Sequence, residues 1–297
     1  MSAIDPDLIR RVARIELRTR KLVDSSLIGA YRAAFRGRGV TFDAVRPYEP
    51  GDDVRHMDWK VSARTGEPHV KQFAAERDLS VMLVIDDSGS MRAGAPRSKR
   101  QVAAELAAAV AWIGGRAGDR VGALTVHSGG TTLVPARRGR NHVLRVIRAV
   151  LGQDASLRGT DLTTALRMTV QAQRQRGIIF VLSDFLASAG DYQTALTLAA
   201  AKHDVVACVV TEPLEHAWPN SGLVSLEDAE TGRRIVVDSG NAAWRVRFVQ
   251  RAQQFDAART RAIVRSGAHR MTVLTDEDPI AALARFMRRR AAEGRRL

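Results

Sequence analysis

The sequence LSVMLVIDDSGSM, residues 79–91, joins a short apolar run directly to acidic and hydroxyl side chains. Residues 81–85 are apolar at every position, which is typical of a strand buried on both faces of a parallel sheet. Similar runs follow at residues 121–126, 178–182, 205–210 and 271–274. Amphipathic helical stretches lie between them, and this alternation predicts βαβ units with right-handed crossovers. We therefore expect an α/β fold, with a doubly wound, mostly parallel sheet and helices on both faces.

Capping signals and periodicity place the helices. Ser98, with Gln101 three residues later, has the spacing of a capping box and predicts a helix start. Trp244 and Phe248 lie four residues apart, a helical spacing, and we expect both in the core. The further helices are expected at residues 160–177, 191–203 and 242–264.

Two hairpins are expected beside the parallel strands. Residues 131–134 follow two glycines closely enough to pair with the strand at residues 121–126. Thr231 and Gly232 separate two further short apolar runs, so we expect a hairpin insertion near residues 222–238.

The composition is that of a globular protein. The chain has 297 residues, of which 45% are hydrophobic, and this length suits one large domain or a medium domain with a smaller companion. Cys208, the single cysteine, lies within an apolar run, so a disulfide framework and a cysteine zinc site are excluded. The N-terminus lacks the apolar core of a secretory signal, and no run approaches the ~20 apolar residues of a membrane span. We expect a soluble, cytoplasmic protein.

The charge of the chain raises the question of nucleic acid. The formal net charge is +14, and clustered Lys and Arg residues attract phosphate. The arginines are dispersed among Ala and Glu, however, and cluster only near residues 288–296. We therefore favour a solvated surface over a nucleic-acid site, and keep a nucleic-acid or acidic-surface binding protein as an alternative function.

Oxygen-bearing side chains gather at the ends of two predicted strands. Asp86, Ser88 and Ser90 have D-x-S-x-S spacing directly after the first strand, and they either cap the next helix or bind a hard divalent cation. Thr160 begins a helix after a glycine, and Asp184 follows the strand at residues 178–182. In a doubly wound sheet of order 3-2-1-4-5-6, the first and fourth strands are neighbours. The sequence therefore predicts five oxygen ligands around Mg²⁺, with Mn²⁺ or Ca²⁺ as alternatives.

Motifs of catalysis are missing around this turn. The sequence has no Walker-type phosphate loop, and no Gly-x-Gly-x-x-Gly follows the first strand. Neither Ser88 nor Ser90 lies in a Gly-x-Ser-x-Gly elbow, which argues against a serine hydrolase. We expect no enzymatic activity, and a metal-dependent hydrolase stays as an alternative because a bound cation can activate water.

The combined motif resembles the metal-ion-dependent adhesion site of von Willebrand factor A domains, over residues 79–297. The resemblance implies that Ser88, Ser90 and Thr160 ligate the ion through their hydroxyls. It also implies that Asp86 and Asp184 act mainly through water or as charge-balancing ligands.

The preceding segment, residues 37–78, narrows the family. It reads GRGVTFDAVRPYEPGDDVRHMDWKVSARTGEPHVKQFAAERD and resembles the segment that precedes the A-like domain in the bacterial family called domain of unknown function 58. Members of that family commonly accompany MoxR-type AAA+ ATPases, and the resemblance implies such a partner. Many members have N-terminal membrane spans, and we expect none here.

Residues 1–78 are expected to form an appendage to the α/β domain at residues 79–297. The appendage should contain a helix near residues 7–23 and the loop-rich family segment. That segment mixes acidic, basic and aromatic side chains, and we favour a structural clasp, with Arg–Asp pairs and a packed Trp59, over a surface for a partner. The residues concerned are Arg46, Tyr48, Asp52, Asp53, Arg55, Asp58, Trp59, Lys60 and Arg64.

Together these features predict a metal-dependent adaptor between proteins. A site made largely of neutral hydroxyls leaves the cation with residual charge, which a Glu or Asp of a client protein can satisfy. The family resemblance implies that the adaptor would work with a MoxR-type ATPase in the assembly, activation or cofactor insertion of that client.

Overall fold

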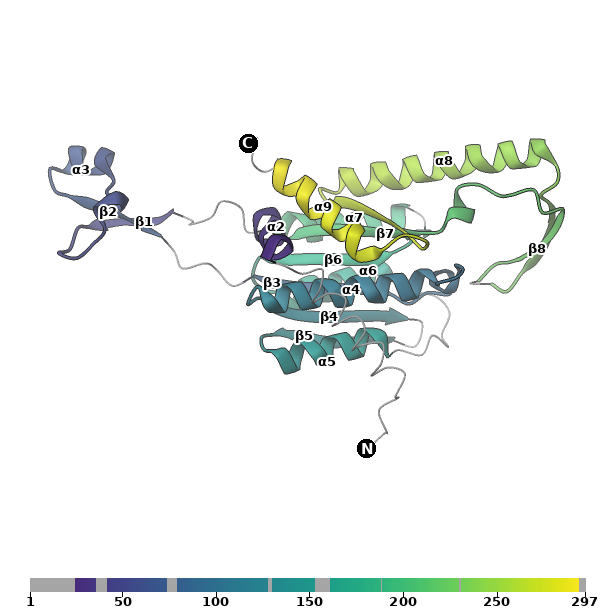
Figure 1. Cartoon of the computed structure of the whole chain (residues 1–297), viewed down its shortest axis with the longest axis horizontal. Helices are drawn as coiled ribbons and strands as arrows, with labels where there is room; N and C mark the ends of the chain where they lie inside the picture. The colour runs from purple at the N-terminus through teal and green to yellow at the C-terminus, as the bar shows by residue number, and fades with distance from the viewer. Residues whose placement is uncertain are drawn as a thin grey trace, which may run out of the picture. The chain divides into compact units, whose positions relative to one another are not determined.

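The computed structural model describes residues 25–35, 42–73, 79–127, 130–152, 161–187, 189–229 and 231–293. Its centre is a sheet with strand order β10-β7-β6-β3-β4-β5 (Figure 1). Five strands run parallel, and β5 pairs antiparallel with β4 as predicted. The strands are β3 (Ser80–Asp86), β4 (Arg120–His127), β5 (Gly130–Arg137), β6 (Ile178–Ser183), β7 (Asp204–Thr211) and β10 (His269–Leu274). In sequence order this is the predicted 3-2-1-4-5-6 arrangement, and the α/β prediction is confirmed.

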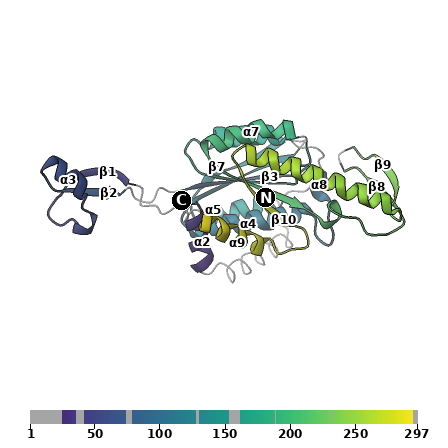
Figure 2. The same cartoon turned by 90° about the horizontal axis from the view of Figure 1, so that it is seen from above.

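The central strands are buried on both faces because helices cover both. Val81, Leu83 and Ile85 of β3 pack into one core cluster, and Met82 and Val84 pack into the other. Figure 2 shows α4 (Lys99–Arg116), α5 (Arg140–Leu151) and α9 (Pro279–Glu293) on one side of the sheet, with α7 (Ala189–Lys202) and α8 (Ala242–Arg265) on the other. The second side also holds α6 (Leu162–Ala172).

The capping box at Ser98 and Gln101 is present at the start of α4, and the predicted helices of α6, α7 and α8 are found. The sequence interpretation missed α5 and α9, although both have apolar residues at helical spacing and bury them against the sheet.

The insertion before α8 also matches the prediction in part. Strands β8 (Leu223–Glu227) and β9 (Arg234–Asp238) form the expected antiparallel hairpin. The prediction that Trp244 and Phe248 belong to the core is wrong. Both are only half-buried and form an aromatic cluster with Trp218. Most of α8 is exposed, and its buried residues lie near its C-terminal end, so its aromatic face has no sheet to cover it.

The chain divides into two units, and the division differs from the expected boundary. The smaller unit is Arg36–Asp78, whereas α2 (Ser25–Phe35) belongs to the larger unit. Leu27 and Tyr31 of α2 are buried in the core, and the Tyr31 hydroxyl donates a hydrogen bond to Asp119 at 2.8 Å. Residues 1–78 therefore do not form one appendage. The helix expected near residues 7–23 lies outside the described residues.

The smaller unit contains an antiparallel pair, β1 (Phe42–Pro47) and β2 (His69–Phe73), with α3 (Trp59–Thr65) between them in sequence. Arg46 makes two hydrogen bonds to Asp52, at 2.6 and 2.8 Å, as expected for a clasp. Trp59, in contrast, is 69% exposed, so it is not packed within the smaller unit. That it pins this segment onto the sheet stays a prediction. Asp58 caps α3 by accepting hydrogen bonds from two backbone N–H groups.

Candidate functional site

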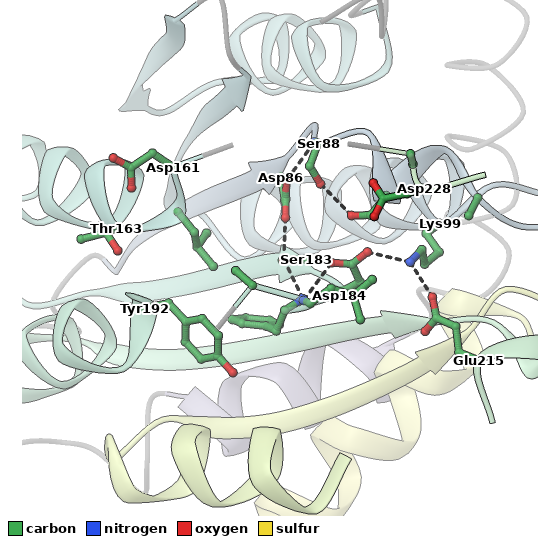
Figure 3. Close-up of a pocket in the computed structure, with 17 residues that line it drawn as sticks. Asp86, Ser88, Lys99, Asp161, Thr163, Ser183, Asp184, Tyr192, Glu215 and Asp228 are labelled. Carbon is green, nitrogen blue, oxygen red and sulfur yellow. Dashed lines mark hydrogen bonds and ion pairs between the residues drawn. The ribbon is translucent and has the colours of Figure 1, made fainter. Parts of the chain in front are cut away.

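The D-x-S-x-S turn lies at the carboxyl end of β3, where the strand order reverses. Ile85 pairs with Leu182 of β6, so Asp86 and Ser183 come next on neighbouring strands. One oxygen of Asp86 accepts a hydrogen bond from the Ser88 backbone N–H at 2.9 Å, and the other accepts one from the Ser183 hydroxyl at 2.6 Å (Figure 3). Asp86 is thus fixed in place by its own turn and by the adjacent strand.

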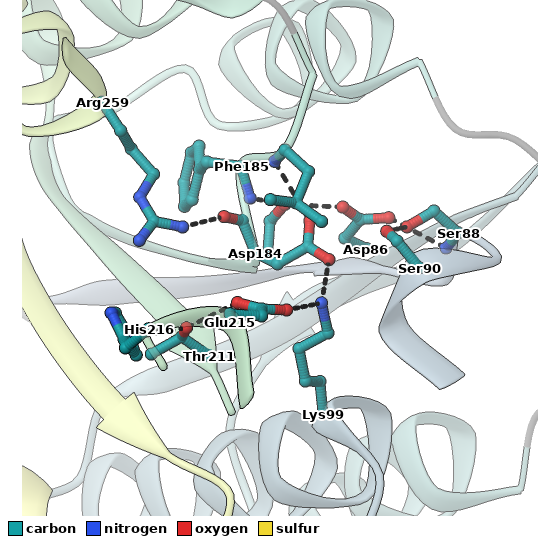
Figure 4. Close-up of polar contacts among 12 residues, drawn as sticks. Asp86, Ser88, Ser90, Lys99, Asp184, Phe185, Thr211, Glu215, His216 and Arg259 are labelled. Atoms are coloured by element: carbon teal, nitrogen blue, oxygen red, sulfur yellow. Dashed lines mark hydrogen bonds and ion pairs between the residues drawn. The ribbon is translucent and has the colours of Figure 1, made fainter. Parts of the chain in front are cut away.

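The two serine hydroxyls of the turn lie close together. Ser88 Oγ and Ser90 Oγ are 3.1 Å apart, within hydrogen-bonding distance (Figure 4). Ser88 is buried and Ser90 is half-buried. Both line a pocket of about 870 Å³, and Asp86 and Asp184 line the same pocket.

Asp184 enters the pocket from the end of β6 and is 2% exposed. Its Oδ1 accepts a hydrogen bond from the Leu186 backbone at 3.2 Å, and its backbone carbonyl accepts one from Arg259 at 2.7 Å. The next residue, Phe185, has a φ of 52°, which is uncommon for a residue other than glycine. Its N–H bonds to Ser183 Oγ at 2.9 Å, and this bond helps to hold the turn that presents Asp184.

The structure therefore brings four of the five predicted ligands together: Asp86, Ser88, Ser90 and Asp184 line one pocket. The fifth, Thr160, lies outside the described residues. Its neighbour Asp161 lines the same pocket and caps α6 by accepting a hydrogen bond from Thr164 N at 3.0 Å. Contact between residue 160 and the other four stays a prediction.

Two charged residues at the site were missed by the sequence interpretation. The ammonium of Lys99 contacts Asp184 Oδ2 at 2.6 Å and Glu215 Oε1 at 2.5 Å (Figure 4). Glu215 lies in a short 3-10 helix, η3 (Pro213–Glu215), and also accepts a hydrogen bond from Thr211 at 2.5 Å. A lysine directly after a helix N-cap could have indicated an acidic partner from the sequence alone, because the helix dipole disfavours a cation at that position.

The adjacent acidic residue, Asp87, plays a different part. Its carboxylate pairs with Arg100 at 2.7 Å, and Arg100 also donates to the Val150 carbonyl at 2.7 Å. Asp87 does not line the pocket among the described residues, and it ties the turn to α4.

The site carries an excess of negative charge. Burial, together with the charge of Asp184, raises the pKa of Asp86, although hydrogen bonds from Ser183 and Ser88 act in the opposite direction. A carboxylate that is desolvated beside a second carboxylate is stabilised by a nearby cation. The electrostatics therefore favour a cation beside Asp86.

The donors also fit Mg²⁺ in kind and spacing. Mg²⁺ takes octahedral oxygen ligands at about 2.1 Å, which places adjacent ligand atoms about 3.0 Å apart. The two serine hydroxyls, 3.1 Å apart, match this spacing. Across the described residues, no group of three or more His, Cys, Asp and Glu side chains is arranged to hold a metal, so hydroxyl oxygens are needed to complete this site. A set of oxygen donors suits Mg²⁺, Mn²⁺ or Ca²⁺ better than a soft ion.

Comparison with known proteins identifies relatives. Residues 44–258 match the family described as "Protein of unknown function DUF58". The uncharacterized protein Rv1480 of Mycobacterium tuberculosis is 38% identical over 296 residues, which covers 97% of this chain and 92% of that protein. Helices long and apolar enough to cross a membrane do not occur in the part of the chain that the structure describes.

Solved structures with a similar arrangement include BatB from Bacteroides thetaiotaomicron, which has a TM-score of 0.46 at 18% identity. That match covers 74% of this chain and all (100%) of BatB. A von Willebrand factor type A protein from Catenulispora acidiphila has a TM-score of 0.40 at 14% identity, covering 74% of this chain and 43% of that chain.

Proposed function

The chain belongs to the DUF58 family, and we propose that it is a protein-interaction adaptor that binds a partner's carboxylate through a divalent cation. The observation that carries the proposal is the pair of serine hydroxyls, 3.1 Å apart, beside two buried carboxylates in an open pocket. A pocket at the switch point of a doubly wound sheet is the usual place for a ligand in such folds.

Each residue has a distinct part in the proposed site. Ser88 and Ser90 would hold the ion through neutral hydroxyl oxygens. The ion would be Mg²⁺, with Mn²⁺ and Ca²⁺ as alternatives. Asp86 would balance charge, since both its oxygens already accept hydrogen bonds, from Ser88 N and Ser183. Asp184 would offer Oδ1, because Lys99 contacts its Oδ2, whereas the hydrogen bond to Oδ1 from the Leu186 N–H is long at 3.2 Å. Thr160 would add a third hydroxyl.

The bound cation would supply an electrophilic position that accepts one further oxygen ligand. Because two of the proposed ligands are neutral hydroxyls, much of the cation's charge would be left for a carboxylate from another protein. The open pocket gives such a side chain access to the ion. The fold, an α/β sheet with the site at the carboxyl ends of its central strands β3 and β6, is compatible with an adaptor of this kind.

We propose a MoxR-type AAA+ ATPase as one partner, and as the other a client that offers the Glu or Asp. The support for the ATPase is the resemblance of residues 37–78 to a family whose members commonly accompany such enzymes. Through this pair, the protein would assist the assembly, activation or cofactor insertion of the client.

An affinity experiment tests the adaptor function. The purified protein and its Ser88→Ala/Ser90→Ala variant are used to capture proteins from native lysate, each in Mg²⁺ and in chelator. We expect an ATPase or client to be retained only by the wild type in Mg²⁺. The same proteins retained in all four conditions would contradict metal bridging. Turnover of model phosphodiesters by the wild type with Mn²⁺ would instead support a hydrolase.

A further inference from the structure

Lys99 is a buried cation within the proposed metal site. Its side chain is 1% exposed, and its ammonium lies between Asp184 and Glu215 (Figures 3 and 4). Lys99 is also the first residue of α4, where the positive end of the helix dipole disfavours a cation. Two carboxylate oxygens nevertheless hold the ammonium, Asp184 Oδ2 at 2.6 Å and Glu215 Oε1 at 2.5 Å. The positive charge of Lys99 is therefore placed inside the site by two ion pairs.

The charged side chains that line the pocket have a net charge that one divalent cation would balance. Asp86, Asp184 and Glu215 supply three carboxylates to the pocket lining, and Lys99 supplies one ammonium. Once ionised, this set has two uncompensated negative charges. Asp161 and Asp228 also line the pocket, but both are exposed, where water screens their charge.

Other charged groups nearby are already compensated or lie off the pocket. Arg100 pairs with Asp87, and Arg259 pairs with Asp256 at 2.6 Å. Glu212, close to Lys99 and Glu215, does not line the pocket among the described residues.

We propose that the ammonium of Lys99, held between Asp184 and Glu215, sets the affinity of the site for one divalent ion and keeps that ion attractive to a partner's carboxylate. This inference rests on the proposed function. By holding Asp184 Oδ2, the ammonium prevents Asp184 from binding the ion through both oxygens. By cancelling one negative charge, it keeps the protein's own carboxylates from outweighing the charge of the ion. A partner's carboxylate then meets a site that is neutral overall instead of negative.

The proposal predicts two effects of opposite sign. Lys99→Met leaves three uncompensated negative charges, so the cation should bind more tightly and an added carboxylate more weakly. Glu215→Gln leaves one such charge, so the cation should bind more weakly and an added carboxylate more tightly. The double variant restores two and should return both affinities close to those of the wild type. A purely structural role for Lys99 would weaken cation binding in every variant.

The experiment measures Mn²⁺ binding to the full chain by electron paramagnetic resonance, which follows the signal of free Mn²⁺. Acetate is the carboxylate probe, and its binding is followed by the loss of water-proton relaxation as it displaces water from bound Mn²⁺. Lys202→Met removes the charge of an exposed lysine on α7 and is the matched control. Circular dichroism confirms that each variant is folded.

We expect Lys99→Met to bind Mn²⁺ about tenfold more tightly and acetate several-fold more weakly, because a unit charge in a partly buried site changes ion affinity at least this much. Glu215→Gln should bind Mn²⁺ about tenfold more weakly, and Lys202→Met should match the wild type. If Lys99→Met does not fold, the acetate affinity of Glu215→Gln still decides the question, because only the proposal predicts that this affinity rises.

Failure of the inference and failure of the proposed function look different. Wild-type binding of Mn²⁺ with equal or weaker binding by folded Lys99→Met, or with unchanged binding by Glu215→Gln, would overturn the role of Lys99 alone. The absence of Mn²⁺ binding by the wild type would overturn both.

Discussion

Asp86 and Asp184 show how single residues acquire a role from their neighbours. The spacing of Asp86, Ser88 and Ser90 could be read from the sequence, because all three belong to one turn after an apolar strand. The Lys99–Glu215 contact could not, because its partners are 116 positions apart and meet only where η3 reaches the first residue of α4. A local pattern reveals donors within a turn, whereas the charge that balances them depends on tertiary packing.

His203 is a buried titratable residue outside the candidate site, and it should make the stability of the protein depend on pH. Its side chain is 3% exposed, and burial, with the charges of Lys202 and Arg176, lowers its pKa from 6.5 to about 4. Between these values the unfolded state binds more protons than the folded state. The stability that His203 contributes is therefore fully present above pH 6.5 and is lost as pH falls toward 4.

His203→Leu should flatten this dependence. We expect the variant to lose about 1–3 kcal/mol less stability than the wild type between neutral and acidic pH, because it has no proton to gain. Urea denaturation at a series of pH values measures the difference. Parallel curves for the two proteins would contradict the assignment.

At the scale of elements, strands and caps were the most predictable features. Buried strands such as β3 are apolar on both faces, and the Ser98 box marks the start of α4. Whether an apolar helix face is covered is not encoded locally. The spacing of Trp244 and Phe248 correctly indicated a helix, yet the start of α8 extends beyond the sheet, and its aromatic residues pack on Trp218 instead.

The cap of α4 should contribute to stability. Ser98 Oγ accepts a hydrogen bond from the Gln101 N–H at 3.2 Å, and the Gln101 side chain accepts one from the Ser98 N–H at 3.1 Å. Ser98→Ala should lower the free energy of unfolding by about 1 kcal/mol. Urea denaturation should show a lower midpoint with an unchanged slope. An unchanged midpoint would show that the box does not stabilise α4.

At the scale of the whole molecule, the sequence indicated a boundary near residue 78 but not the discontinuity of the larger unit. Helix α2 precedes the smaller unit in the chain and packs in the core of the larger one. Local patterns along residues 1–78 cannot show this, because the contacts of α2 are made with α9 and α4, far along the chain.

Two aromatic residues distinguish the roles of these segments. Tyr31→Ala should destabilise the larger unit by about 3 kcal/mol, since Tyr31 is fully buried and its loss leaves a cavity. Trp59→Ala should change stability by less than about 0.5 kcal/mol, because Trp59 is mostly exposed. Thermal and urea unfolding of both variants test this contrast. Equal effects would contradict the difference in burial between Tyr31 and Trp59.

The central claim is that the turn after β3 and the end of β6 hold one divalent cation. A crystal of the protein soaked in Mn²⁺ and measured at the manganese absorption edge tests it most directly. The account predicts a single strong anomalous peak in contact with the hydroxyl oxygens of Ser88 and Ser90, and its loss in the Ser88→Ala/Ser90→Ala variant. A pocket without a peak, or a peak unaffected by the double substitution, would contradict the account.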